Sequence, residues 1–196
     1  MKRYVELGDI ADINVGVVLS RKEATYRKST SISYDLFNLK IYEDKMTGSN
    51  SQYEKFTTDE SLDDYVIKEN DLLMRLAFPL KIIYADKDLS GKLISNQYVR
   101  VRLKNDDFRA KFVRWYLESE DVYHQLEKYL VGTAVRTIPV VKIKEIRIPI
   151  VNKRKQINIE KLVDIWNEQK ILFNNLVDNK EKLINESIKL IIKEEN

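Results

Sequence analysis

The chain has 196 residues, of which 43% are hydrophobic and 33% are charged, and its formal net charge is +3. This length and composition predict one globular domain with an apolar core plus an extended element. The mild positive charge permits nucleic-acid binding without establishing it, and the absence of cysteine excludes disulfides and thiolate metal sites. No apolar run is long enough for a membrane span or a signal peptide, so we expect a cytoplasmic protein with no membrane partner.

The N-terminal part predicts a strand that contains Val5 and Leu7, a turn at Gly8–Asp9 and a short ordered segment that ends at Gly16. Residues 20–60 are polar and basic, with tyrosines between the charges. Cations and amides mixed with aromatic rings can bind phosphates and hydrogen-bond to bases. The candidate DNA contacts here are Arg21, Lys22, Arg27, Lys28, Lys45, Asn50, Gln52 and Tyr53. The same composition also fits a solvated variable loop whose tyrosines fold back on the core.

Residues 65–103 have the pattern of β-structure, with compact apolar runs at Leu72–Leu76 and Leu80–Ala85. Apolar residues alternate with Arg100 and Arg102 in the run Val99–Leu103. This alternation predicts a half-buried strand with a basic outer face. A charged outer face is ordinary for a strand, so we assign the two arginines no DNA contact.

The next segment predicts a single helix, capped at its N-terminus by Asp106 or Asp107 and ended by Gly132. The only histidine, His124, falls late in this helix. The sequence places no cysteine or second histidine beside it, as a metal site would require. We therefore assign it no chemistry.

A polar loop at Gly132–Ile138 follows, and then a strand-like run at Ile146–Ile150. Polar loops on a β scaffold can vary in sequence without disturbing the core, which suits residues that read DNA. The candidate DNA contacts in this loop are Thr133, Arg136 and Thr137.

The last quarter of the chain, from Asn152 to Glu194, has no glycine or proline and repeats apolar residues every seven positions. This spacing predicts a long helix with a coiled-coil seam that needs a partner helix. Polar residues in the seam, at Gln169, Lys180 and Ser187, can fix the register and the orientation of the pair. The residues expected to form a dimer are Leu162, Trp166, Phe173, Leu176, Leu183 and Leu190.

The predicted fold class is therefore α+β. A globular, β-rich domain occupies residues 1–151, and a long C-terminal coiled-coil helix occupies residues 152–196. The globular domain is the candidate for DNA recognition, and the helix is the candidate for dimerisation.

Signatures of common enzymes are missing. The sequence has no phosphate-binding loop, no dinucleotide fingerprint, no nucleophile elbow and no zinc spacing. One weak nuclease-like arrangement exists, in which Asp35, Glu43 and Lys45 could hold Mg²⁺. Two alternatives to DNA recognition therefore stay open: a small Mg²⁺-dependent nuclease, and a coiled-coil interaction or regulatory module that does not read DNA.

Short motifs in a consistent order connect the chain to a known family. They are Leu7–Ile13, Ile67–Arg75, Leu93–Tyr98, Arg114–Leu117, Gly132–Ile138, Ile146–Ile150 and Lys155–Ile157. Together they resemble a target-recognition domain and spacer helix of the specificity (S) subunit of type I restriction-modification systems. The chain departs from the family pattern at Asn70, where a glycine is common, at Val151–Asn152, where the second proline is missing, and at Lys155, where a glutamate is usual.

The resemblance implies a non-catalytic DNA-binding subunit that docks methyltransferase (M) and restriction (R) subunits. No cofactor is expected on this chain, because S-adenosylmethionine, ATP and Mg²⁺ would bind the partner subunits only. Family members of usual size carry two recognition domains and two helices, whereas this chain has one of each. It is therefore expected to form an antiparallel homodimer that reads a split palindromic site. Arg75, through its family-like motif, and Arg136, through its loop, are the best candidates for reading bases.

Overall fold

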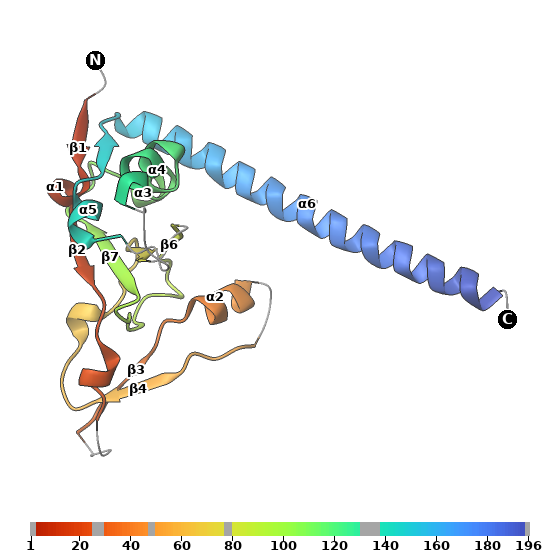
Figure 1. The fold of residues 1–196 in the computed structure, drawn as a ribbon, viewed down its shortest axis with the longest axis horizontal. Coiled ribbons are helices and arrows are strands. Elements are labelled where there is room, and N and C mark those ends of the chain that lie inside the picture. The colour runs from red at the N-terminus through yellow and green to blue at the C-terminus, as the bar shows by residue number, and fades with distance from the viewer. Residues whose placement is uncertain (1–2, 25–29, 47–49, 77–79, 130–137, 195–196) are drawn as a thin grey trace. The chain divides into compact units, whose positions relative to one another are not determined.

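The computed structural model describes residues 3–24, 30–46, 50–76, 80–129 and 138–194 (Figure 1). The chain divides into two compact units, Met1–Lys153 and Arg154–Asn196. The first unit is rich in β-strands, and the second is helical. The sequence-based prediction of a β-rich globular part followed by a long C-terminal helix is therefore confirmed.

The strands of the first unit form antiparallel sheets. They are β1 Tyr4–Glu6, β2 Ala11–Val15, β3 Ile32–Asp35, β4 Lys55–Thr58, β5 Leu72–Arg75, β6 Ile82–Tyr84, β7 Tyr98–Leu103 and β8 Arg147–Pro149. The largest described sheet has four strands in the order β2-β7-β5-β6. Two smaller sheets pair β1 with β8 and β3 with β4.

Short helices connect these strands, and one long helix ends the chain. The α-helices are α1 Leu7–Ile10, α2 Leu39–Met46, α3 Ala110–Leu117, α4 Glu120–Leu126, α5 Val140–Lys144 and α6 Lys153–Glu194. The 3₁₀ turns are η1 Leu19–Arg21, η2 Asp63–Tyr65 and η3 Glu127–Tyr129. Helix α3 lies against β6, and the Ile82 amide donates a hydrogen bond to Glu118 Oε1 at 3.2 Å.

Strand β5 runs through the centre of the core. Leu72, Leu73 and Met74 are all fully buried, so the strand is covered on both faces, as its continuous apolar run predicts. One hydrophobic cluster comprises Phe37, Ile67, Leu73, Ile83, Ala85, Leu89, Ile94 and Tyr98. A second comprises Val17, Phe56, Leu62 and Leu93. Both clusters combine residues of the large sheet or its flanking loops with residues of the 32–58 segment, and so fix that segment to the sheet.

The chain approaches itself closely just after β2. The Gly16 amide donates a hydrogen bond to the Tyr98 carbonyl at 3.0 Å, and a Cβ at Gly16 would lie 2.3 Å from the Ser95 carbonyl oxygen. No side chain fits this space, so the position requires glycine. The end of β2 is consequently packed directly on the backbone of the turn that precedes β7.

Two sequence-based expectations for the N-terminal part need adjustment. The first strand, β1, ends at Glu6, so Leu7 is not part of it. The predicted turn at Gly8–Asp9 is one turn of helix, α1, in which the Ala11 amide donates a hydrogen bond to the Leu7 carbonyl.

The predicted single helix from Asp106 or Asp107 is wrong. Helix α3 is preceded by Arg109, which makes no side-chain cap, and the chain leaves the helix at Ser119 before α4 starts. The Ser119 hydroxyl donates to the Tyr116 carbonyl at 2.6 Å, a local bond that competes with helix continuation. The predicted end at Gly132 lies outside the described residues.

The predicted basic outer face of β7 is also wrong. Arg100 is buried, with 6% of its surface exposed, and the Arg102 side chain is 26% exposed and paired with Asp71. The alternation of the sequence identifies two faces of the strand, but the segment before β5 covers the second face as well.

Candidate nucleic-acid interface

The basic segment at residues 20–60 is folded over much of its length. It contains β3, α2 and β4, and its tyrosines Tyr34, Tyr42 and Tyr53 pack against the hydrophobic clusters. The Tyr34 hydroxyl accepts a hydrogen bond from the Leu62 amide at 3.0 Å. These three rings are thus partly buried against the core, as the alternative interpretation of the segment predicts.

Tyr53, a candidate DNA contact, lies close to two cations. Lys45 Nζ is 5.1 Å and Lys92 Nζ is 4.8 Å from the centre of its ring, a distance at which cation–π attraction operates. Burial raises the pKa of Tyr53 to about 12, so its hydroxyl is neutral. The neighbouring Asn50 and Gln52 are exposed.

The other candidates from the sequence fall into separate places. Arg21 is exposed, whereas Lys22 forms an ion pair with Glu60 at 2.8 Å. Arg75 is exposed at the end of β5. The remaining candidates lie outside the described residues: Arg27, Lys28, Thr133, Arg136 and Thr137.

A cleft of about 530 Å³ lies beside Arg75. Four parts of the chain line it: the η1 region, the start of α2, the end of β5, and the turn that precedes β7. The polar residues of its wall are Ser20, Asn38, Lys40, Glu43, Arg75, Ser95, Asn96, Gln97 and Tyr98. Among them Glu43 is ion-paired with Lys81, so its charge is compensated.

The turn from Ser95 to Tyr98 forms one side of the cleft and is held by backbone bonds. The Tyr98 amide donates to the Ser95 carbonyl at 3.1 Å, the Asn96 amide to the Val17 carbonyl at 2.9 Å, and the Leu76 amide to the Gln97 carbonyl at 3.2 Å. The exposed side chains of Asn96 and Gln97 therefore project from a fixed backbone.

Arg75 sits opposite Tyr98 in the β5–β7 pairing. Burial raises the pKa of the Tyr98 hydroxyl, and the positive charge of Arg75 acts in the opposite direction. Within the part of the chain that the structure describes, Arg75 makes no side-chain hydrogen bond or ion pair. The Ile138 amide donates to the Leu76 carbonyl at 3.2 Å, so the end of the predicted 132–138 loop is fixed next to Arg75.

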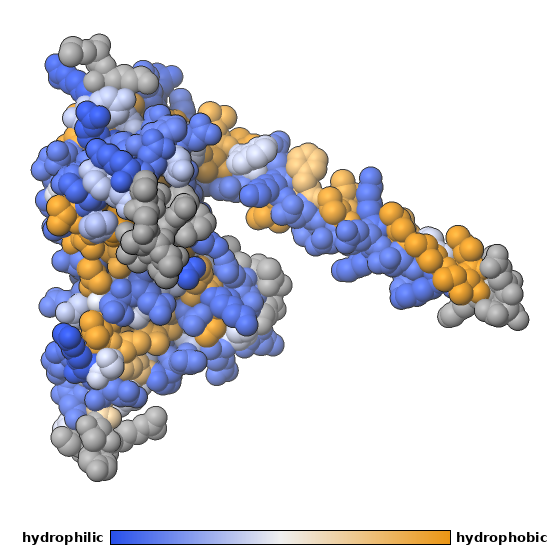
Figure 2. Space-filling model, in the orientation of Figure 1, coloured by the Kyte–Doolittle hydropathy of each residue, from blue (hydrophilic) through white to orange (hydrophobic). Residues whose placement is uncertain are grey.

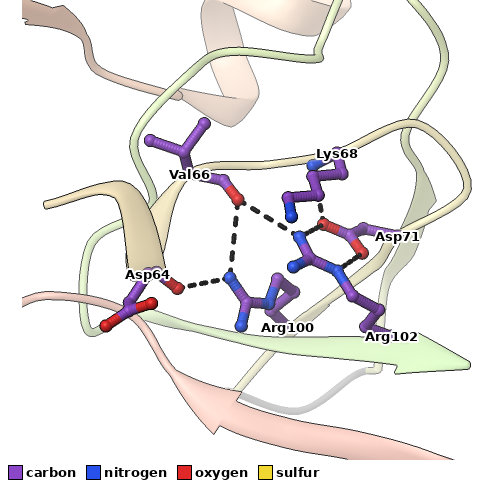
Figure 3. A network of polar contacts seen from close by, with 6 residues as sticks. All are labelled: Asp64, Val66, Lys68, Asp71, Arg100 and Arg102. Carbon is purple, nitrogen blue, oxygen red and sulfur yellow. Dashed lines mark hydrogen bonds and ion pairs between the residues drawn. The ribbon is translucent and has the colours of Figure 1, made fainter. Parts of the chain in front are cut away.

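A polar network anchors the segment that leads into β5 (Figure 3). Arg102 donates to Asp71 twice, from Nε to Oδ1 at 2.7 Å and from Nη2 to Oδ2 at 2.6 Å. The Lys68 amide donates to Asp71 Oδ2 at 2.7 Å. These bonds satisfy a carboxylate that is only 1% exposed, as a buried charge requires.

Arg100 extends this network to the loop that contains Asp64 and Val66. Its Nη1 donates to the carbonyls of Asp64 and Val66, and Arg102 Nη2 also donates to the Val66 carbonyl, at 3.3 Å. Burial lowers the pKa of Arg100, whereas the hydrogen bonds to Asp71 raise the pKa of Arg102. Arg100 Nε is buried and has no partner among the described residues. The two arginines therefore act as structural groups rather than as a DNA-facing surface.

Several residues of the cleft are not predicted from the sequence. Lys40, Asn96 and Gln97 were not among the candidate contacts, although Asn96 and Gln97 belong to a family-like motif. The available signal was a pair of amide side chains next to an apolar strand. Only the backbone pairings show that this pair lies next to Arg75.

The nuclease alternative gains no support from the described residues. Asp35 is paired with Lys55 at 2.6 Å, and Glu43 with Lys81. In the described part of the chain, no group of three or more His, Asp or Glu side chains could hold a metal ion. His124 is exposed and lies 3.4 Å from Glu127 Oε2.

In the described part of the chain, no helix is apolar over a length sufficient to span a membrane.

Helix α6 carries an exposed apolar stripe (Figure 2). Figure 2 shows hydrophobic side chains along most of its length. Half or more of the surface of each predicted dimer residue is exposed, from 50% at Leu176 to 68% at Leu162. The full set is Leu162, Trp166, Phe173, Leu176, Leu183 and Leu190. So many exposed large apolar side chains on one helix mark an interaction site.

Comparison with known proteins gives matches among solved structures only. No protein-family model matches the chain, and no curated protein matches it in sequence. The HsdS subunit from Thermoanaerobacter tengcongensis is 17% identical over 89% of this chain and 44% of that one, with a TM-score of 0.64. The S subunit of a Type-I restriction-modification system from M. genitalium is 18% identical over 95% and 44%, with a TM-score of 0.57.

A third match is a chain from work on complex assembly and conformational transition of a type I R-M system. It is 18% identical over 86% of this chain and 38% of that one, with a TM-score of 0.54. The present chain thus spans less than half the length of each of these solved chains. The likeness establishes the fold, and the fold that the sequence motifs implied is confirmed.

Asp71 and Asp35 allow a matched test of the polar network. Both carboxylates are 2.6 Å from a cationic nitrogen, but Asp71 is buried and Asp35 is 41% exposed. Replacing Asp71 by Ala should lower the free energy of unfolding by about 3 kcal/mol, because it leaves Arg102 and the Lys68 amide without their acceptor. Asp35→Ala should change it by about 0–1 kcal/mol. Urea denaturation followed by circular dichroism measures both, and equal effects would contradict the structural role of the network.

Proposed function

We propose that the chain is a DNA-binding specificity subunit of a type I restriction-modification complex and performs no chemistry itself. The observation that carries this proposal is the shared fold, which extends over 86–95% of the chain and includes two solved S subunits. The order of the sequence motifs supports the same assignment. The cleft beside Arg75 contains the cationic side chains of Lys40 and Arg75 and supplies a surface suited to an anionic partner.

Under this proposal the two units have different tasks. The globular unit binds one half of a split DNA site, with contacts from the cleft and from the 20–60 and 132–138 segments. The chemistry belongs to partner subunits, which bring S-adenosylmethionine, ATP and Mg²⁺. The chain docks methyltransferase subunits and, where they exist, restriction subunits.

We also propose that α6 pairs with α6 of a second copy in antiparallel orientation. The exposed stripe along α6 supports this, since burying it against an equal helix removes a large apolar area from water. Two-fold symmetry places identical DNA-binding units in equivalent positions. Such a dimer reads a palindromic site whose two halves are inverted across an unread spacer.

The exposed stripe also favours a second candidate function. A helix of this kind can recruit a different protein, in which case the chain is a coiled-coil interaction or regulatory module without DNA readout. The two functions differ in whether the purified chain binds DNA and in whether it pairs with itself.

The purified chain should bind duplex DNA without cutting or methylating it. Fluorescence anisotropy with a labelled random-sequence duplex measures the affinity. The logarithm of the binding constant should fall with the logarithm of salt concentration by about 0.9 for each phosphate neutralised, because counterions are released. An affinity that hardly changes between about 50 and 200 mM salt would count against DNA binding and favour the interaction module.

Polar substitution in the stripe should dissociate the dimer. Leu176→Gln together with Leu183→Gln should give monomers, because each buried leucine contributes about 1.5–3 kcal/mol. Light scattering of the full chain measures the mass. The control is Asn175→Gln with Lys182→Gln, two exposed positions on the opposite side of the helix, which should leave the dimer intact.

A monodisperse wild-type monomer at tens of micromolar would overturn the homodimer. The stripe would then belong to an interface with a different protein. The DNA-binding proposal would stand or fall separately, on the salt dependence.

A further inference from the structure

We propose that the cleft beside Arg75 holds the sugar–phosphate backbone of duplex DNA. Arg75 and Lys40 supply the cationic contacts, and Asn96 and Gln97 supply neutral hydrogen-bond donors. This inference rests on the proposed DNA-binding function and assigns a site and a ligand group to it. Under this inference Arg75 contacts a backbone phosphate, whereas its family-like motif suggests that it reads a base.

The donors of the cleft have no partner among the residues that the structure describes. Arg75, Lys40, Asn96 and Gln97 are all exposed, and their side chains make no hydrogen bond or ion pair with the residues that the structure describes. The carboxylate of the cleft, Glu43, is already paired with Lys81. Among the described residues, the wall therefore presents two positive charges without an ion-pair partner and two amides, a set that suits a phosphodiester.

The shape of the site favours the backbone over the bases. Base edges lie at the floor of a groove, and proteins reach them with a helix or a two-stranded ribbon that protrudes into the groove. A recessed site of about 530 Å³ cannot enter a groove. It can accept the ridge between two grooves, and that ridge is the sugar–phosphate backbone.

The donors are also positioned before DNA arrives. Asn96 and Gln97 project from the turn that is fixed to Val17 and Leu76 and packed on Gly16. Lys40 lies in the first turn of α2, where Asn38 Oδ1 accepts hydrogen bonds from the Lys40 and Ile41 amides at 2.9 and 3.3 Å. Such capping fixes the start of a helix. Little backbone order has to be gained on binding, which favours affinity.

The test compares Arg75→Ala with Lys87→Ala in the full chain, using random-sequence duplexes and fluorescence anisotropy at several salt concentrations. Both changes remove one exposed positive charge, but Lys87 does not line the cleft. Arg75→Ala should lower affinity by roughly tenfold and reduce the salt slope by about 0.9, equally for all duplexes. Gln97→Ala should lower affinity by roughly threefold without changing the slope, since it removes a neutral donor.

Three other outcomes overturn the inference and leave different conclusions. If Arg75→Ala changes the preference at one base pair, the cleft reads bases. If Arg75→Ala behaves like Lys87→Ala, DNA binds elsewhere on the chain. If the wild-type chain shows no salt-dependent affinity, DNA binding itself fails. Arg75→Lys keeps the charge and should preserve the slope, which separates loss of a phosphate contact from loss of folding.

We infer, from a separate observation, the register of the proposed α6 pair. Two rows of the seam repeat every seven residues, one through Ile159, Trp166 and Phe173 and the other through Leu162, Leu176 and Leu183. Each row contains one long polar residue, Lys180 in the first and Gln169 in the second. In an antiparallel pair, residues of the first row face residues of the second row on the other helix.

One register places the two polar residues opposite each other. Residues whose numbers add to 349 then face one another, so Lys180 of one copy meets Gln169 of the other, twice by symmetry. The remaining layers pair Ile159 with Leu190, Trp166 with Leu183, Phe173 with Leu176 and Ser187 with Leu162. The two helices overlap from residue 155 to residue 194, almost the full length of α6.

Other registers leave polar groups against apolar ones. A slip of seven residues one way sets Lys180 against Leu162 and Gln169 against Phe173, and the opposite slip sets Lys180 against Leu176. An ammonium without an acceptor is destabilising in an apolar layer. Ser187 tolerates its apolar neighbour, because its hydroxyl donates to the Leu183 carbonyl of its own helix at 2.9 Å.

Disulfide trapping tests this register, because the chain has no cysteine of its own. The full-length variants Leu162→Cys and Ser187→Cys, mixed and oxidised, should form a covalent heterodimer, since a disulfide needs Cβ atoms about 4 Å apart. Each variant alone should stay uncrosslinked, because these positions do not meet their own copies in the antiparallel pair.

The remaining outcomes overturn this register. Crosslinking of Leu162→Cys with Lys180→Cys, or of Gln169→Cys with Ser187→Cys, would show a register shifted by seven residues. Crosslinking of Ser187→Cys with itself would show a parallel pair. No crosslink in a sample that light scattering shows to be dimeric would refute the register but keep the homodimer, whereas a monomeric sample would refute both.

Discussion

The buried carboxylate of Asp71 is the constraint on which the candidate interface depends. A charge that is 1% exposed persists only with full compensation, and here Arg102 and the Lys68 amide provide it. These bonds tie the segment before β5 to β7, and the β5–β7 pairing then sets Arg75 beside Tyr98. The position of Arg75 relative to the Ser95–Tyr98 turn therefore follows from a polar group deep in the unit.

The sequence could predict only those parts of the site that lie within one continuous stretch of chain. The motif around Ile67–Arg75 identified β5 and its terminal arginine, because a continuous apolar run that ends in a charge is visible in one stretch of chain. The cleft itself combines η1, the start of α2, the end of β5 and a turn before β7. Sequence spacing says nothing about which of these distant segments meet, so Lys40 and Gln97 had no visible connection to Arg75.

The wrong predictions for β7 and for the helix after it have the same origin, because they too depend on contacts between distant or individual residues. Alternation in β7 correctly indicates two faces, but it does not say what covers each face, and the 64–71 segment turns Arg100 and Arg102 into internal hydrogen-bond donors. The helix after β7 has an apolar pattern that continues past Ser119, yet one serine bond to the Tyr116 carbonyl accompanies its interruption. Periodicity reports burial, whereas such breaks depend on individual polar contacts.

Helix α6 presents the opposite case, because periodicity predicted it almost to the residue but left its stability unexplained. Most of its large apolar side chains are exposed, and an isolated helix in water gains little from propensity alone. Burying the stripe supplies the missing free energy, so the order of α6 is linked to the concentration of whatever covers it. If a second copy does so, the two globular units, which we propose to bind DNA, are held together only in the dimer. Recognition of a split site would then be a property of the dimer, and binding to single half-sites would remain the weak, salt-sensitive property of one unit.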